Sequence, residues 1–245
     1  VGKVAFPPGG FPPYAGNGGT PTIGNFDADP FPEIAIECTD EFVVLDNSLL
    51  PKWSTPIFDV SSTVTAAMAF DFDCDGIQEI VFRDEGLLRI FNPLTGAVLG
   101  QISSGNQTSR EHPLLADINA DGHANIAMST SGKVVAFESD NMHWSPTREV
   151  MNQFAYTSTN INDDLTIPCT QQNNAHPALT NMNGFLFQPN LRDQNDECYT
   201  VVPTENISIS SYIDTAMCQG DTMLLAPMDW WQYTYSWTPP IGLNR

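Results

Sequence analysis

Short apolar stretches alternate with polar turns between residues 21 and 146, and the same succession of stretches occurs three times. In each unit a brief apolar run enters an acidic turn, a β-branched run leaves it, and two further apolar runs follow. Runs this short, rich in Val, Ile and Phe and bounded by Gly, Pro, Asn and Asp, predict β-strands. Helical periodicity is nearly absent, so the pattern predicts an all-β fold.

Each unit is expected to contain four short strands. We predict the first strand at 22–24, 67–70 and 114–116, the second at 34–36, 80–82 and 126–128, and the third at 42–45, 88–91 and 134–137. A fourth short strand is expected near Trp53, Leu99 and Trp144. Four antiparallel strands in roughly 40–50 residues are the size of one β-propeller blade.

The length of the repeat also favours a propeller. Asn25, Asp71 and Asp117 open the three acidic turns at a constant interval of 46 residues. A solenoid is the alternative, but its repeats are usually shorter, roughly 20–30 residues. Because a propeller ring needs at least about four blades, we expect further blades upstream or a degenerate copy downstream. The pair His112–Pro113 recurs as His176–Pro177, which is consistent with such a copy.

Changes in composition divide the chain into four parts. Residues 1–20 are rich in Gly and Pro and read as a loop or the end of an upstream blade. Residues 21–146 hold the three blades, and residues 147–203 form an Asn- and Gln-rich irregular segment, with a degenerate blade and a linker. In residues 204–245, Cys218 on one predicted strand and Trp237 on the next resemble the start of an incomplete Ig-like β-sandwich.

The acidic turns carry oxygen-bearing side chains at loop positions 1, 3, 5 and 9. This alternation suits a hard divalent cation, which binds through oxygen and takes several carboxylates at once. The predicted ligands are Asn25, Asp27, Asp29 and Glu33 in the first loop, Asp71, Asp73, Asp75 and Glu79 in the second, and Asp117, Asn119, Asp121 and Asn125 in the third, with the backbone carbonyl of Phe31, Ile77 or His123 at position 7. We expect calcium, because magnesium demands a tighter octahedral shell and keeps its waters. The alternative is that the acids only cap turns.

The three loops are not equivalent. The second carries the most carboxylates and is expected to bind most tightly, whereas the third carries two formal charges, and affinity follows ligand charge. Position 6 is Gly76 in the second loop and Gly122 in the third, and glycine permits the left-handed backbone of a tight loop. The first loop has Pro30 there, so a different shape is expected, because proline cannot take that conformation.

Charge and hydropathy exclude several functions. The 245 residues carry 29 acids against 9 Lys and Arg, a net charge of −20. Nine of these acids lie in the acidic loops (three, four and two). Such a surface repels nucleic acid and anionic lipid. No apolar run approaches the roughly 18 residues of a membrane span, and no signal peptide is visible. The first residues read like a strand in progress, so we expect the sequence to begin inside a longer protein.

Five cysteines and four histidines complete the candidate chemistry. No CxxC pair is present, so we expect a Cys169–Cys198 disulfide, with Cys38–Cys74 as another possible pair, in an extracellular protein. No nucleophile elbow, zinc motif or P-loop is found. We therefore expect no enzyme activity, and we expect His112 and His176 to make structural hydrogen bonds at strand entrances.

The loop pattern D-x-[DN]-x-D-G-x-x-[DEN]-[IL], repeated across residues 20–146, resembles the FG-GAP/VCBS repeats of integrin-α-type propellers. The resemblance implies calcium in the loops that join the first two strands of each blade. It also implies adhesion or ligand recognition on the surface of the propeller, with a protein or glycan on another surface as the partner.

The sequence after the repeats is similar to large surface proteins of Bacteroidota that are associated with gliding motility and type IX secretion. The similarity is carried by residues 144–148 and 162–168 and by the run that begins at Cys218. It implies a calcium-stabilised adhesion or scaffold segment at the cell surface, associated with the outer membrane and packed against neighbouring domains of the same chain. The alternative is a non-catalytic propeller or carbohydrate-binding module appended to a secreted hydrolase.

Overall fold

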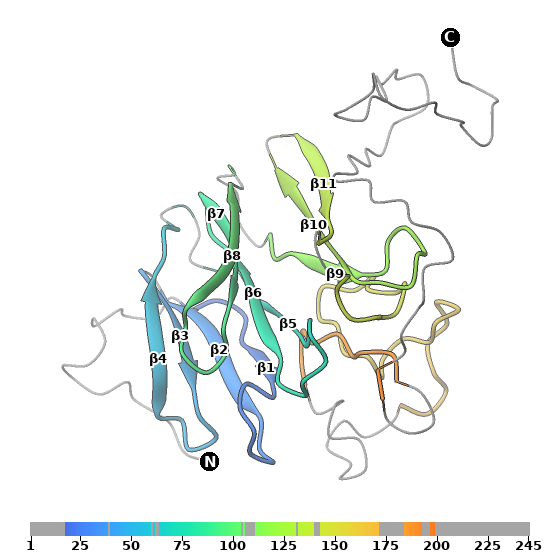
Figure 1. Ribbon diagram of the computed structural model, residues 1–245, viewed down its shortest axis with the longest axis horizontal. Helices are drawn as coiled ribbons and strands as arrows, with labels where there is room; N and C mark the ends of the chain where they lie inside the picture. Colours follow the sequence, from blue (N-terminus) through green and yellow to red (C-terminus); the bar gives the residue numbers. More distant parts are fainter. Residues whose placement is uncertain are drawn as a thin grey trace.

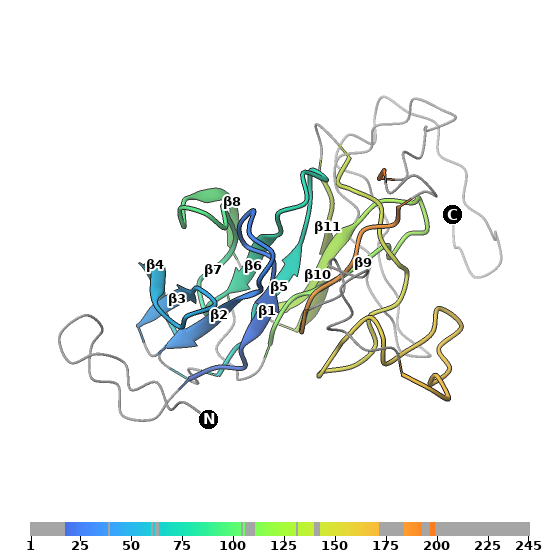
Figure 2. The same ribbon diagram turned by 90° about the horizontal axis from the view of Figure 1, so that it is seen from below.

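The computed structural model describes residues 18–38, 40–59, 61, 64–103, 105, 111–130, 132–139, 143–171, 184–192 and 197–198. Over these residues the chain forms eleven β-strands and no helix (Figures 1 and 2). The strands make three antiparallel sheets, so the all-β prediction is confirmed. The predicted Ig-like start at residues 204–245 and the loop at residues 1–17 lie outside the described residues.

The first two sheets are built alike. The first runs β1 (Thr22–Gly24), β2 (Glu33–Cys38), β3 (Glu41–Leu45), β4 (Pro51–Pro56), and the second runs β5 (Met68–Phe70), β6 (Glu79–Arg83), β7 (Leu87–Phe91), β8 (Val98–Ser103). In both, each strand pairs with the next one along the chain. Both also shift register at the same place, after Val44 in β3 and after Ile90 in β7, which lie 46 residues apart. The register shift in the third strand is therefore part of the 46-residue repeat.

The third sheet has three strands, β9 (Leu114–Ala116), β10 (Asn125–Thr130) and β11 (Lys133–Phe137). The fourth strand expected near Trp144 is wrong, because no strand occurs in the described residues 143–147. The backbone there bonds to the acidic loops instead. The Ser145 N–H donates to the Phe72 carbonyl at 3.0 Å, and the Ala124 N–H donates to the Ser145 carbonyl at 3.2 Å.

The second sheet lies between the other two. Residues of β2 alternate between buried and half-buried, as expected for a strand with one face on the core. Every residue of β6 is buried, so both faces of that strand are covered. The first strands of the sheets also contact one another, β1 with β5 and β5 with β9. The three sheets are therefore arranged side by side through their first strands (Figure 1).

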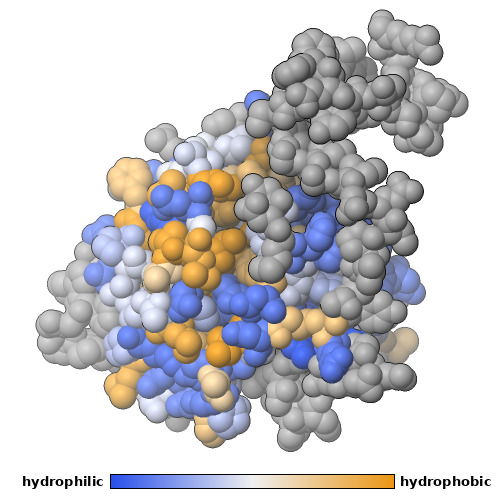
Figure 3. Space-filling model, in the orientation of Figure 1, coloured by the Kyte–Doolittle hydropathy of each residue, from blue (hydrophilic) through white to orange (hydrophobic). Residues whose placement is uncertain are grey.

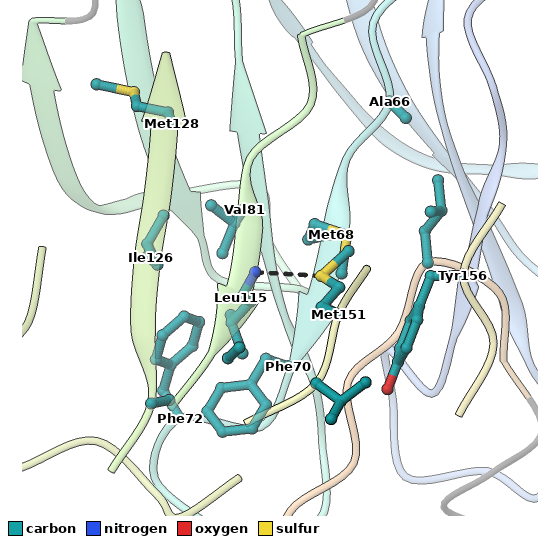
Figure 4. Close-up of a cluster of buried hydrophobic side chains, with 14 of the residues drawn as sticks. Ala66, Met68, Phe70, Phe72, Val81, Leu115, Ile126, Met128, Met151 and Tyr156 are labelled. Atoms are coloured by element: carbon teal, nitrogen blue, oxygen red, sulfur yellow. Dashed lines mark hydrogen bonds between the residues drawn. The ribbon is translucent and has the colours of Figure 1, made fainter. Parts of the chain in front are cut away.

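Two apolar clusters fill the spaces between the sheets. The one between the first and second sheets is aromatic: the Phe42 ring stacks on Phe91 with centroids 5.8 Å apart and lies 4.5 Å from Phe82. The other joins the second and third sheets and includes Met151 and Tyr156 from the irregular segment (Figure 4). Burying each such side chain contributes roughly 1.5–3 kcal/mol. Residues after the repeats thus form part of the core.

One segment crosses the first strands of the sheets. We call residues 184–192 the crossing segment. Phe185 and Ile23 exchange two backbone hydrogen bonds of 2.9 Å, and the Ala69 N–H donates to the Leu186 carbonyl at 3.0 Å. The Gln188 side chain, fully buried, donates to the Leu115 carbonyl at 2.9 Å. The crossing segment therefore ties β1, β5 and β9 together (Figure 2).

The visible surface mixes polar and apolar side chains (Figure 3). Large apolar side chains are exposed on and beside β8, namely Leu94, Val98 and Leu99. Among the described residues there is no helix with the length and apolar character to cross a bilayer.

Candidate metal centre

The acidic loops link the first two strands of each sheet, between β1 and β2, β5 and β6, and β9 and β10. Because the first strands lie side by side and the second strand runs back along each of them, the loops belong to the same edge of the assembly (Figure 1). The structure thus gives the three loops equivalent positions, as the 46-residue spacing predicts.

In the second loop, backbone N–H groups turn the carboxylates inward. Asp71 accepts hydrogen bonds from the N–H groups of Asp75 (3.1 Å) and Gly76 (2.9 Å). Glu79, at the start of β6, accepts one from the Phe72 N–H at 2.9 Å. As a result, carboxylate oxygens of Asp71, Asp73 and Glu79 all lie within 4.8 Å of one another. Three convergent carboxylates are a donor set that a hard cation takes.

The third loop reproduces this hydrogen-bond pattern. Asp117 accepts from the N–H groups of Asp121 (3.2 Å) and Gly122 (2.8 Å), and Asn125 accepts from the Ile118 N–H at 2.8 Å. The backbone angles match as well: φ is +92° at Gly76 and +90° at Gly122. The expectation that glycine at position 6 takes a left-handed conformation is confirmed.

The first loop has a different backbone, as Pro30 predicts. No residue from Asn25 to Glu33, all of them described, has a positive φ. Proline has no N–H to donate to position 1, and the Asn25 amide points to the neighbouring loop, where its Nδ2 donates to the Gly76 carbonyl at 3.0 Å. Even so, carboxylate oxygens of Asp27, Asp29 and Glu33 lie within 4.8 Å of one another. Proline at position 6 therefore changes the backbone conformation of the loop, but its three carboxylates stay close together.

Two buried oxygens of the first loop support a cation there. Glu33 is fully buried, and its Oε2 accepts from the Phe26 N–H at 2.7 Å. Its Oε1 and the Oδ1 of Asn25 have no hydrogen-bond partner among the described residues. Buried polar atoms are nearly always satisfied, and a bound cation would satisfy both oxygens.

The pKa values of the acidic clusters show that the folded structure disfavours the ionised form of several of their carboxylates. Burial, together with the charges of nearby aspartates, raises the pKa of Glu33 and of Glu79 to about 7. Burial also raises the pKa of Asp71. Asp27 behaves differently: burial opposes the change, but the Lys52 ammonium bonds to it and lowers its pKa. A positive charge in each cluster would stabilise the ionised carboxylates.

The third loop gains an acid that the repeat does not predict. The Asn119 Nδ2 donates to Asp121 at 3.0 Å and lies 3.4 Å from the Glu138 carboxylate, just beyond β11. Burial and the charge of Asp121 raise the pKa of Glu138. Glu138 therefore adds to the two formal charges of this loop.

At position 7 of the loops, the Phe31 side chain is exposed, whereas the His123 side chain makes contacts of its own. The His123 Nδ1 lies 2.9 Å from the Trp144 carbonyl, and its ring stacks on His143 with centroids 4.4 Å apart. The His123 side chain therefore links the third loop to the segment that contains His143 and Trp144. That the carbonyls of Phe31, Ile77 and His123 are ligands stays a prediction.

Both expected disulfides are wrong. Cys74 pairs with Cys198, with Cα atoms 6.3 Å apart, whereas Cys169 is exposed and free and Cys38 is free. Cys38 lies at the far end of β2 from the loops, whereas Cys74 is position 4 of the second loop. Their places in the two repeats are therefore not equivalent.

The end of the crossing segment lies on the second loop. The Asn190 Nδ2 donates to the Asp71 carbonyl at 2.6 Å, and the Arg192 guanidinium lies 3.6 Å from the Asp71 carboxylate. An isolated bridge between Arg192 and Cys198 leads from there to the disulfide. These residues lie about 120 positions from the loop, and no local pattern in the sequence marks them.

The expected hydrogen bonds of His112 are also wrong. Neither ring nitrogen has a partner among the described residues, and the ring packs edge-on against Phe154 at 4.8 Å. Burial lowers the pKa of His112, because a buried site disfavours the charged imidazolium. His176 lies outside the described residues.

The described residues thus define an all-β protein with three antiparallel sheets and two acidic clusters that could hold a metal ion. Among solved structures, the chain is similar to the V. cholerae biofilm matrix protein Bap1, with 27% sequence identity and a TM-score of 0.59. The match covers 65% of this chain and 28% of Bap1, so the chain corresponds to a minor part of that protein. No protein-family model and no curated protein sequence matches the chain.

Proposed function

We propose that the three acidic loops bind calcium and that the ion is structural. The side chains at positions 1, 3, 5 and 9 of each loop would hold it, and calcium would neutralise carboxylates that otherwise repel one another. The convergence of Asp71, Asp73 and Glu79 within 4.8 Å carries this proposal. The unsatisfied oxygens of Asn25 and Glu33 support it in the first loop.

The three sheets are, in this proposal, blades of an FG-GAP-like β-propeller whose other blades lie elsewhere in the protein. Three features support the assignment: the four-stranded order of the first two sheets, the contacts between first strands, and the place of the acidic loops between first and second strands. Radial packing of blades through their innermost strands is how a propeller forms its core.

The function we assign is extracellular adhesion or scaffolding, with calcium keeping the binding surface rigid. The likeness to a biofilm matrix protein supports it, as does the net charge of −20, which disfavours nucleic acid as a partner. The proposal assigns no catalytic step to the chain. Its partner is a protein or glycan on another surface, reached outside the cell.

The test is a binding assay with beads that carry the purified chain. We expect the beads to attach to extracellular matrix polysaccharide or to a cell surface in calcium and to detach in chelator. The double variant D71N/E79Q should reduce attachment, whereas C169S, which changes an exposed free thiol, should not. Attachment that is equal in calcium and chelator, or no attachment to any surface, would contradict the function.

A further inference from the structure

A lysine from another strand of the first sheet lies on the first acidic cluster. Lys52, in β4, pairs with Asp27, which is position 3 of the loop. Both side chains are largely buried, with 21% of Lys52 and 17% of Asp27 exposed. The ammonium also acts on Glu33: burial raises the pKa of Glu33 to about 7, and the Lys52 charge opposes that rise. One positive charge is therefore already placed against two acids of the cluster.

Both carboxylate oxygens of Asp27 are in use. The Oδ1 atom accepts the Asp29 N–H at 2.8 Å, and the Oδ2 atom pairs with Lys52. A cation that takes Asp27 as a ligand must displace the ammonium or lie close beside it. In either case it meets a positive charge in a partly buried place, where charges are screened less than in water. Lys52 therefore opposes the binding of a metal ion to this loop.

The lysine does not complete the first cluster. It supplies one positive charge against the three acids Asp27, Asp29 and Glu33. The Oε1 atom of Glu33, which is fully buried, still has no hydrogen-bond partner among the described residues, and neither does the Oδ1 atom of Asn25. Buried oxygens are nearly always paired. The cluster thus keeps oxygen donors that the ammonium does not reach and that a divalent ion would satisfy.

This lysine is not part of the 46-residue repeat. Lys52 is the residue that the register shift between β3 and β4 leaves unpaired, and the corresponding residue between β7 and β8 is Leu99, which is apolar and exposed. The second cluster has a cation from elsewhere, since the Arg192 guanidinium lies 3.6 Å from the Asp71 carboxylate. In the described part of the chain, no lysine or arginine pairs with an acid of the third loop. Each cluster of three carboxylates thus has one cationic side chain, and the two come from unrelated parts of the chain.

We propose that Lys52 is a counter-ion of the first acidic cluster that stabilises the loop without metal and lowers its affinity for calcium. Lys52 would thereby set the calcium concentration at which the first loop fills. Calcium would displace the ammonium from the Oδ2 atom of Asp27, and the loss of that ion pair would weaken binding. This inference rests on the proposed binding of calcium by the acidic loops.

Calorimetric calcium titration of the full chain tests the inference, in the background D71N/E79Q/D117N, which removes ligands from the other two loops. There K52Q should bind calcium ~10-fold more tightly than the parent, because a positive charge near the ion is removed. K52R keeps the charge and should bind like the parent. The matched control is K133Q, because Lys133 lies exposed at the start of β11, and it should leave the affinity unchanged.

Melting temperatures of K52Q in the otherwise wild-type chain give a second readout, which needs no bound metal. In chelator, K52Q should melt lower than the wild type, because the acids lose their counter-ion. In saturating calcium, the two proteins should melt at the same temperature.

The inference is overturned if K52Q binds calcium no more tightly than the parent, or if it melts lower by the same amount in both buffers. Either result would mean that Lys52 only makes a structural ion pair. A complete lack of calcium binding by the wild type and by every variant would instead overturn the proposed calcium loops, and this inference with them.

Discussion

The first and second acidic loops both carry acids at positions 3, 5 and 9, and they differ at position 1 and in what surrounds them. In the second loop, position 1 is Asp71, which accepts two backbone hydrogen bonds and lies beside Arg192. In the first loop, position 1 is Asn25, which donates to the second loop. The second loop is also fixed by a disulfide, whereas the first is bordered by Lys52.

This difference separates two properties of an acidic loop. The spacing of the acids is enough to bring three carboxylates together, since both loops do so. The backbone conformation depends on position 6 and on the hydrogen bonds to position 1. We therefore expect both loops to bind calcium but only the second to hold a preformed shell, and the predictions below test that distinction.

The largest effect is expected from removing the disulfide that holds the second loop. The Cys74–Cys198 disulfide spans 124 residues, so C198S should lower the free energy of unfolding by ~2–5 kcal/mol. Chemical denaturation measures this. The matched control is C169S, because Cys169 is exposed and free, and it should leave the midpoint unchanged. Equal destabilisation by both variants would contradict the pairing.

Exchanging position 1 should change calcium affinity in opposite directions. D71N removes a charge and keeps the shape of the side chain, so affinity at the second loop should fall by ~10-fold or more. N25D adds a charge to the first loop and should strengthen binding there. Calorimetric titration distinguishes the two. A weaker first site in N25D would show that the Asn25 hydrogen bond to Gly76 matters more than ligand charge.

Glycine at position 6 should matter for stability even without metal. A Cβ on Gly76 meets no atom within 4 Å, so G76A acts only through the backbone at φ +92°. The expected loss in free energy of unfolding is ~1–2 kcal/mol. G100A is the control, because Gly100 in β8 is equally open and has no positive φ. P30G should destabilise the protein less than G76A does. Thermal unfolding in chelator measures both effects.

The smallest effect is expected from pH. The folded-state pKa of Glu33 and Glu79 is about 7, above the ordinary value of 4.5. Between these values the folded state binds more protons than the unfolded state, so stability in chelator should fall as pH rises from 4.5 to 7 and then level off. Calcium affinity should rise over the same range, because the metal takes the ionised carboxylate.

The E79Q variant isolates the share of the second loop in this pH dependence. In chelator, the melting temperature of E79Q should fall less than that of the wild type between pH 4.5 and 7. A slope identical to that of the wild type would mean that Glu79 titrates at its ordinary pKa.

The sequence predicts this fold well wherever the repeat controls it. Nine of the eleven strands match predicted ranges within a few residues, and β4 and β8 lie where strands were expected near Trp53 and Leu99. The missing fourth strand of the third sheet could not be predicted. Trp144 looks like the equivalent of Trp53 and Leu99, but its ring packs against Phe72 at 4.8 Å. Tertiary contacts here override the local pattern.

The acidic clusters were predictable for the same reason, since loop spacing alone brings their acids together. The residues that surround these clusters could not be predicted from the sequence. Arg192, Asn190 and Cys198 reach the second loop only because the crossing segment passes over β1 and β5. Such contacts depend on the folded arrangement, and periodicity carries no information about them.

A crystal structure of the protein grown in millimolar calcium tests the central claim most directly. We predict an ion in the second loop, coordinated at roughly 2.3–2.6 Å by oxygens of Asp71, Asp73, Asp75 and Glu79. An empty second loop with these carboxylates turned toward solvent would contradict it.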